Sequence, residues 1–225
     1  MASDAAPPPL LLAFDTSAAQ CAAALVRSGR LLATRTEAMD RGQAERLLPL
    51  LEELLAEAGV AWSDLDGLAV VTGPGNFTGL RIAVAAARGL ALGLDRPAVG
   101  ISRFEVLAAG VDGPVLAGLD DRRGGIAVQA FDRGTPLGPP APGWPTQAPL
   151  PGTLCLGDGA EAAAAALGLG HRPAGSEPAA DLALVARLAA ARLQAGQPPP
   201  PAPLYLRPAD AAPPREAAPA LLDDA

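Results

Sequence analysis

The first half of the chain alternates between short apolar runs and longer segments in which apolar residues recur every three or four positions. The runs predict strands, and the longer segments predict helices. The first three strands follow one another through short turns, which is typical of an antiparallel meander. The expected strands are 10–14, 21–26, 31–37, 68–71 and 97–101, and the expected helices are 43–58, 79–92 and 104–109. This βββαβαβ order predicts a mixed sheet with helices on its faces.

The helix predicted at 43–58 carries more leucine than one sheet contact needs. Its leucines and Ala58 cover an arc of roughly 160°, whereas a helix packed on one sheet needs an apolar stripe of about 100° or a little more. Two interpretations stay open: the helix lies deep in its own domain, or the leucines at its edges, Leu48 and Leu55 or Leu50, face a second surface. Pro49 either costs a hydrogen bond inside the helix or marks its first turn.

The helix predicted at 79–92 is rich in small residues, which allow close approach of neighbouring elements on more than one side. Its only charges, Arg81 and Arg88, are seven residues apart and share one face. We expect it to pack on a sheet on one side and on another helix on the other. Asn76 or Thr78 is expected to cap its start, and Gly93 to close its end.

The second half predicts a smaller α/β unit. Strands are expected at 115–119, 126–131 and 153–157, helices at 160–167 and 181–195, a long loop at 133–152 and a polyproline-like stretch at 197–203. The predicted organisation is a flexible tail (1–9), an N-terminal lobe (10–110), a C-terminal lobe (111–207) and a disordered Pro/Ala-rich tail (208–225).

Composition excludes some classes of function. The net charge of −7 argues against a free-standing nucleic-acid binder, although Arg122 and Arg123 form a local basic patch. Cys21 and Cys155 are far apart, lie in apolar runs and are expected to be buried. No basic signal region precedes the first apolar run, and no stretch is expected to be long enough to span a membrane. We therefore expect a soluble, cytoplasmic protein.

The glycine loop between the strand at 68–71 and the next helix is the main candidate for chemistry. Glycine N–H groups at a helix start attract phosphate, so Asp15, Gly73, Gly75 and Thr78 form a candidate vestigial phosphate loop. The spacing matches neither a P-loop, which needs a lysine that this chain lacks, nor a dinucleotide loop. A tight strand-to-helix turn is the favoured interpretation. The single histidine, His171, lies in a loop context, and no zinc motif, catalytic triad or full catalytic set can be assembled.

Five segments, taken in order, resemble the TsaB (YeaZ) family of tRNA threonylcarbamoyladenosine biosynthesis proteins. They are Leu12–Ser17, Gln43–Pro49, Gly73–Ile82, Asp120–Gly124 and Tyr205–Arg207. The resemblance implies an α/β, actin/hexokinase/Hsp70-like fold of two lobes, with mixed sheets flanked by helices. Gln43-Ala44-Glu45 stands where the family often has His-Ser-Glu, and Gly125 replaces a usual Glu, which casts doubt on any active role for these positions.

The resemblance also implies a function without catalysis by this chain. TsaB-like proteins are degenerate relatives of TsaD, the subunit that transfers the threonylcarbamoyl group, and they pair with TsaD and act with TsaE. ATP and metal belong to those partner subunits, and tRNA is met only within the complex. Whether the chain pairs with itself when TsaD is absent stays open. The implied pairing surface comprises Glu45, Leu48, Leu51, Leu55, Gly79, Arg81, Ala83, Ala86 and Arg88. The alternative is an actin-fold ATP-binding phosphotransferase that uses Asp15 and the glycine loop; a peptidase fits least, because the residues it needs are missing.

Overall fold

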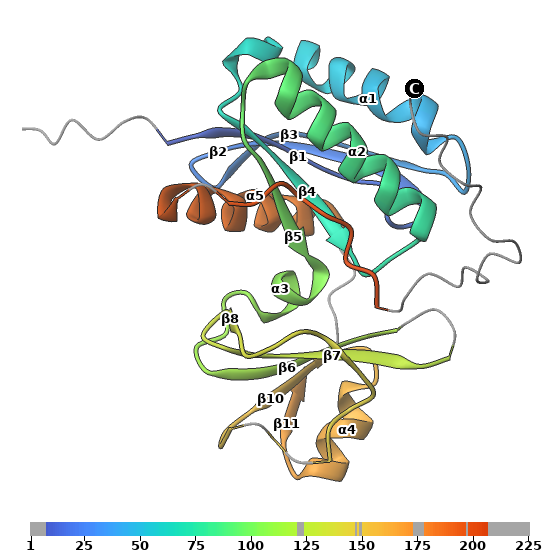
Figure 1. The fold of residues 1–225 in the computed structure, drawn as a ribbon, viewed down its shortest axis with the longest axis vertical. Helices are drawn as coiled ribbons and strands as arrows, with labels where there is room; N and C mark the ends of the chain where they lie inside the picture. The colour runs from blue at the N-terminus through green and yellow to red at the C-terminus, as the bar shows by residue number, and fades with distance from the viewer. Residues whose placement is uncertain are drawn as a thin grey trace, which may run out of the picture.

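The computed structural model contains two β-sheets, one above the other, each flanked by helices (Figure 1). It describes residues 8–120, 124–146, 148, 150–172, 178–196 and 198–206. The expectations for residues 1–7, for the tail at 208–225 and for Arg122 and Arg123 lie outside the described residues.

The first sheet has five strands in the order β3-β2-β1-β4-β5. Its strands β1, β2 and β3 form the predicted antiparallel meander, and β4 and β5 continue the sheet in parallel with β1. The elements of this part are β1 (Leu10–Asp15), β2 (Gln20–Arg27), β3 (Arg30–Ala38), α1 (Gln43–Glu57), β4 (Gly67–Gly73), α2 (Phe77–Leu94) and β5 (Ala98–Ser102). The βββαβαβ order predicted for the first half is confirmed.

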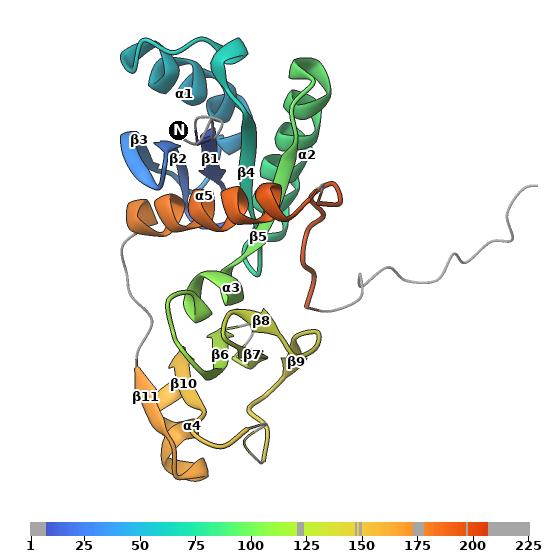
Figure 2. The same cartoon turned by 90° about the vertical axis from the view of Figure 1, so that its left-hand side faces the viewer.

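Both faces of the first sheet are covered by helices. Helices α1 and α2 lie side by side on one face, and α5 (Pro178–Ala195) crosses the other (Figures 1 and 2). Every residue of β1 and of β4 is buried. A central strand whose two sides are both apolar needs a helical layer on each face, because water would otherwise remain against one of them.

The second sheet has six strands, with the path β11-β10-β6-β7-β8 and with β9 paired to β7. One core cluster joins it to α3, and another joins it to α4 on the opposite face. Its elements are α3 (Arg103–Ala108), β6 (Pro114–Asp120), β7 (Ile126–Asp132), β8 (Thr135–Pro136), β9 (Ala141–Pro142), β10 (Leu154–Gly157), α4 (Ala160–Leu167) and β11 (Gly170–Arg172).

Several local expectations differ from the structure. Helix α5 was expected in the second lobe, but its buried residues, Leu182 to Ala189, pack on the first sheet. His171 lies in the short strand β11 rather than in a loop, and the loop at 133–152 contains β8 and β9. Pro49 sits inside α1, and α2 ends at a left-handed Asp95 rather than at Gly93.

The segment 198–206 returns between the two sheets after α5. The Leu204 N–H donates to the Thr72 carbonyl at the end of β4, with 2.8 Å between nitrogen and oxygen. The side chains of Leu204 and Leu206 pack against the core of the second sheet. This segment therefore contacts both lobes near the start of α2.

Candidate functional site: the glycine loop and the face of helices α1 and α2

The glycine loop between β4 and α2 packs directly against the turn that follows β1. The Thr16 hydroxyl donates to the Gly79 carbonyl (2.7 Å), and the Asn76 N–H donates to the Ser17 carbonyl (2.7 Å). A Cβ atom at Gly79 would lie only 1.9 Å from the Thr16 carbonyl oxygen, and one at Gly75 would lie 2.7 Å from the Ser17 carbonyl oxygen. The two glycines are required because backbone from the β1–β2 turn fills the space beside them.

The polar groups of this loop serve the chain's own backbone. Asp15 accepts the Ser17 N–H at 2.7 Å, and Asn76 caps α2 by accepting the Gly79 N–H at 3.0 Å. Asn76 is thus one of the two caps that the sequence predicted. Gly73 has φ of +108°, which favours glycine, and a Cβ there would meet Leu80. Thr78 is exposed. The geometry is that of the tight strand-to-helix turn favoured from the sequence.

Helix α2 is unusually apolar for a helix with one open face. By length and composition it would qualify as a membrane span, yet only 28% of its 18 residues are buried in the protein. The expectation that no stretch has this length and composition was wrong, although a single such helix is weak evidence for a membrane segment. Its buried side packs on the first sheet, whereas its open side presents apolar and small residues together with Arg81 and Arg88 and is contacted near its start by Tyr205.

The predicted interface residues divide into a buried and an exposed group. Leu51, Leu55 and Ala83 are buried in the core between α1, α2 and the first sheet, and Gly79 is buried against the β1–β2 turn, so none of the four faces a partner. This corrects their assignment to the surface and resolves Leu55 as a core residue. The exposed or partly exposed group is Glu45, Leu48, Arg81, Ala86 and Arg88.

The exposed group is extended by residues that the sequence analysis did not single out. Leu48 is 45% exposed and lies one helical turn from the buried Leu51 and two turns from the buried Leu55. On α2, Phe77 is 48% exposed and Leu92 is 86% exposed. Together with the exposed members of the predicted group, these residues define what we call the α1–α2 face. No pattern in the sequence separated Phe77 and Leu92 from core residues, because both have core-type side chains.

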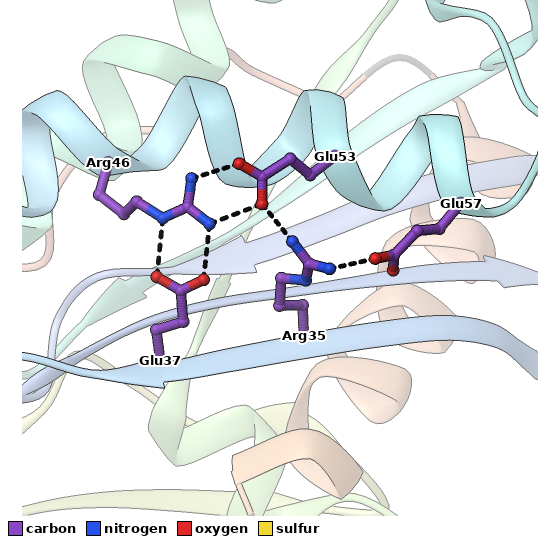
Figure 3. Close-up of polar contacts among 5 residues, drawn as sticks. All are labelled: Arg35, Glu37, Arg46, Glu53 and Glu57. Atoms are coloured by element: carbon purple, nitrogen blue, oxygen red, sulfur yellow. Dashed lines mark hydrogen bonds and ion pairs between the residues drawn. The ribbon is translucent and has the colours of Figure 1, made fainter.

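The opposite edge of α1 is closed by an ion-pair network with strand β3 (Figure 3). Arg46 pairs with Glu37 at 2.6 Å and with Glu53 at 2.7 Å, and Arg35 contacts both Glu53 and Glu57. Hydrogen bonds from the Arg46 guanidinium lower the pKa of Glu37 and of Glu53. The network anchors the edge strand to α1, so this edge of the helix is charged and internally paired, whereas Leu48 lies on the open side between the exposed Glu45 and Glu52.

Tyr205 from the C-terminal segment reaches the start of α2. The Arg81 Nε donates to the Tyr205 hydroxyl at 2.9 Å, and the Phe77 and Tyr205 ring centroids are 5.2 Å apart. This contact joins residues 124 positions apart in the sequence. The sequence analysis noted Tyr205 only as part of a family motif, since no local pattern links it to α2.

A cleft of about 530 Å³ lies between the lobes, bordered by α3, α5 and the segment 198–204. Its polar side chains include Ser102, Glu105, Gln129 and Arg192, and Glu105 is ion-paired with Arg192. Among the described residues, no three His, Cys, Asp or Glu side chains gather as metal ligands. The two cysteines are buried, as predicted, and burial raises the pKa of the Cys21 thiol to about 11. The cleft therefore presents polar groups that already have partners within the chain.

Comparison with known proteins agrees with this architecture. The family model for TsaD, tRNA N6-adenosine threonylcarbamoyltransferase, matches residues 32–134. The tRNA threonylcarbamoyladenosine biosynthesis protein TsaB of Escherichia coli is 36% identical over 128 residues, which is 55% of this chain and 55% of that protein. An uncharacterized protein of Mycobacterium bovis is 35% identical over 208 residues, covering 90% of this chain and 94% of the relative. The alignments with the three curated TsaB proteins of Escherichia coli, Haemophilus influenzae and Bacillus subtilis span about half of each relative's length.

A solved structure extends the likeness over the whole fold. YeaZ from Pseudomonas aeruginosa superposes with a TM-score of 0.66 at 31% identity, over 88% of this chain and 100% of that chain. The two flanked sheets, with a β-meander leading the first, define a protein of the actin/hexokinase/Hsp70-like class. Within that class, the chain belongs to the TsaB (YeaZ) family.

Proposed function

We propose that this protein is a non-catalytic subunit in the formation of threonylcarbamoyladenosine beside the anticodon of tRNA, and that it pairs with TsaD through the α1–α2 face. Membership of the TsaB family supports the pathway. The match of residues 32–134 to the TsaD family model supports a common origin with the transferase. The main support for the pairing is helix α2, which is apolar although only 28% of its 18 residues are buried in the protein.

The glycine loop supports the non-catalytic part of the proposal. A phosphate site needs free N–H groups and room for the anion. Here the Gly79 N–H is used by Asn76, and the Thr16 and Ser17 backbone lies where Cβ atoms of Gly79 and Gly75 would be. We therefore assign ATP and any metal to the partner subunits TsaD and TsaE. Contact with tRNA would occur within the complex, in the cytoplasm.

Leu48→Glu tests the proposed surface. Leu48 is 45% exposed, so the change should alter the stability of the isolated protein by less than about 0.5 kcal/mol. In calorimetric titration with the TsaD subunit of the same organism, it should weaken binding at least tenfold, because a charge would be buried without a partner. The matched control is Leu137→Glu, at a leucine 50% exposed in the second lobe, which should leave the affinity unchanged.

Three results would overturn the proposal or a part of it. Separate elution of the wild-type chain and TsaD on gel filtration at micromolar concentrations would remove the pairing. Micromolar binding of Mg-ATP by the isolated chain, with phosphoryl transfer, would favour the phosphotransferase alternative. Equal affinity of the Leu48→Glu and Leu137→Glu variants would show that TsaD binds elsewhere on the molecule.

A further inference from the structure

A cation and two aromatic rings form a compact cluster at the N-terminal end of α2. The Arg81 guanidinium carbon lies 3.9 Å from the Phe77 ring centroid and 5.8 Å from that of Tyr205. The Arg81 Nε is bonded to the Tyr205 hydroxyl. Arg81 is therefore held by two rings and one hydrogen bond although its surroundings are open, since Phe77 is 48% and Tyr205 is 42% exposed.

The charge of Arg81 is not neutralised within the chain. No carboxylate among the residues that the structure describes forms an ion pair with Arg81, whereas Arg35, Arg46 and Arg192 are all paired with glutamates. Helix α2 itself contains no acidic residue. Arg81 is thus an arginine that is fixed in place and unpaired on the α1–α2 face, in a chain with a net charge of −7.

The C-terminal segment explains how Tyr205 is kept in position. Leu204 and Leu206 pack toward the second core, while Tyr205 between them points out, which is the alternation of an extended chain. The hydrogen bond from the Leu204 N–H to Thr72 fixes the backbone against β4. An ordered arginine loses less side-chain entropy on binding, so its contact contributes more to affinity.

We propose that Phe77, Arg81 and Tyr205 form a preorganised receptor for a carboxylate of the partner subunit, with Tyr205 as the residue that positions Arg81. The Nε group is occupied by Tyr205, and the two Nη groups remain to bind a carboxylate. This inference rests on the proposed function, because the partner is TsaD bound at the α1–α2 face. The inference adds that TsaD presents an acidic side chain opposite Arg81, surrounded by apolar residues.

Charge favours such a partner over a second copy of this chain. Two copies that paired α2 against α2 would bring Arg81 and Arg88 of each close together, and on this face only α1, through the exposed Glu45, offers a carboxylate of the chain's own. A partner with a carboxylate at this position removes the repulsion and neutralises Arg81. A homodimer that uses this cluster is thus an alternative that the experiment has to distinguish.

The test measures the affinity of the full-length chain for TsaD in a double-mutant cycle. Arg81→Gln should weaken binding at least tenfold, and Arg81→Lys should recover only part of that loss because an ammonium lacks the guanidinium fork. Tyr205→Phe keeps the ring, removes the hydrogen bond to Arg81 and should weaken binding about three- to tenfold. In the Arg81→Gln background, Tyr205→Phe should leave the affinity for TsaD unchanged, because Tyr205 acts through Arg81. If Tyr205 only stabilised the fold, the substitution would weaken binding in both backgrounds.

Controls separate this inference from the proposed function. Arg27→Gln removes one exposed charge at the opposite end of the first sheet and should leave the affinity unchanged. Thermal unfolding of each variant checks that the fold persists. If the wild type binds TsaD and Arg81→Gln binds as Arg27→Gln does, the carboxylate receptor is refuted while the proposed function stands. A self-association that needs Arg81 and that TsaD does not displace would refute the choice of partner.

Discussion

Replacing Gly79 with alanine tests the packing that defines the glycine loop. A Cβ atom at this position would lie 1.9 Å from the Thr16 carbonyl oxygen, and real Cβ contacts essentially never fall below 3.0 Å. The backbone of the β1–β2 turn or the start of α2 would therefore have to move by about 1 Å. Both are backbone segments of a buried region, so neither can yield as a flexible side chain would.

The expected loss of stability follows from three contributions. Overpacking of this kind costs about 1–3 kcal/mol. The shift also disrupts the 2.7 Å hydrogen bond from the Thr16 hydroxyl to the Gly79 carbonyl, at about 1 kcal/mol. Alanine regains about 1 kcal/mol through its higher helix propensity. The net loss is about 2 kcal/mol, which for a chain of this size lowers the Tm by roughly 4–8 °C.

Gly89→Ala is the matched control on the same helix. Nothing lies within 4 Å of a Cβ atom at Gly89, so only the gain in helix propensity remains. This variant should be more stable than the wild type by up to about 1 kcal/mol. Urea unfolding of both variants at one protein concentration provides the measurement. If Gly79→Ala were as stable as Gly89→Ala, the claim that chain backbone fills the loop would be wrong.

Two further predictions concern titratable groups. Arg46 lowers the pKa of Glu37 and of Glu53, so both carboxylates stabilise the native state above their unfolded pKa of about 4.3, and this contribution is lost as the pH falls through the lower native values. In low salt, the unfolding free energy of Arg46→Gln should therefore fall less steeply below about pH 5 than that of the wild type, and parallel profiles would contradict the role of the network. Burial raises the pKa of Cys21 to about 11 and also raises that of Cys155, so a thiol reagent at pH 8 should label neither cysteine in the native protein and both in urea. Rapid labelling of the native protein would show that the thiols are accessible.

The elements themselves were largely readable from the sequence. Strand β1, helix α1 and helix α4 fall within a residue or two of their predicted bounds, because each depends on the local spacing of apolar residues. The cap at Asn76 and the turn character of the glycine loop also depend on neighbours in the chain. The family motifs are local in the same sense, which is why the resemblance indicated the fold.

Long-range packing decided the rest. The pattern of α5 shows an apolar face but not which sheet it covers, and the structure places it on the first sheet. The same residue types on α1 and α2 became core at Leu55 and Ala83 but open surface at Leu48 and Leu92, because burial depends on what lies opposite. The contact between Arg81 and Tyr205 joins the start of α2 to the end of the described chain. Periodicity along the sequence determines which side of an element is apolar, and only the tertiary arrangement determines what that side meets.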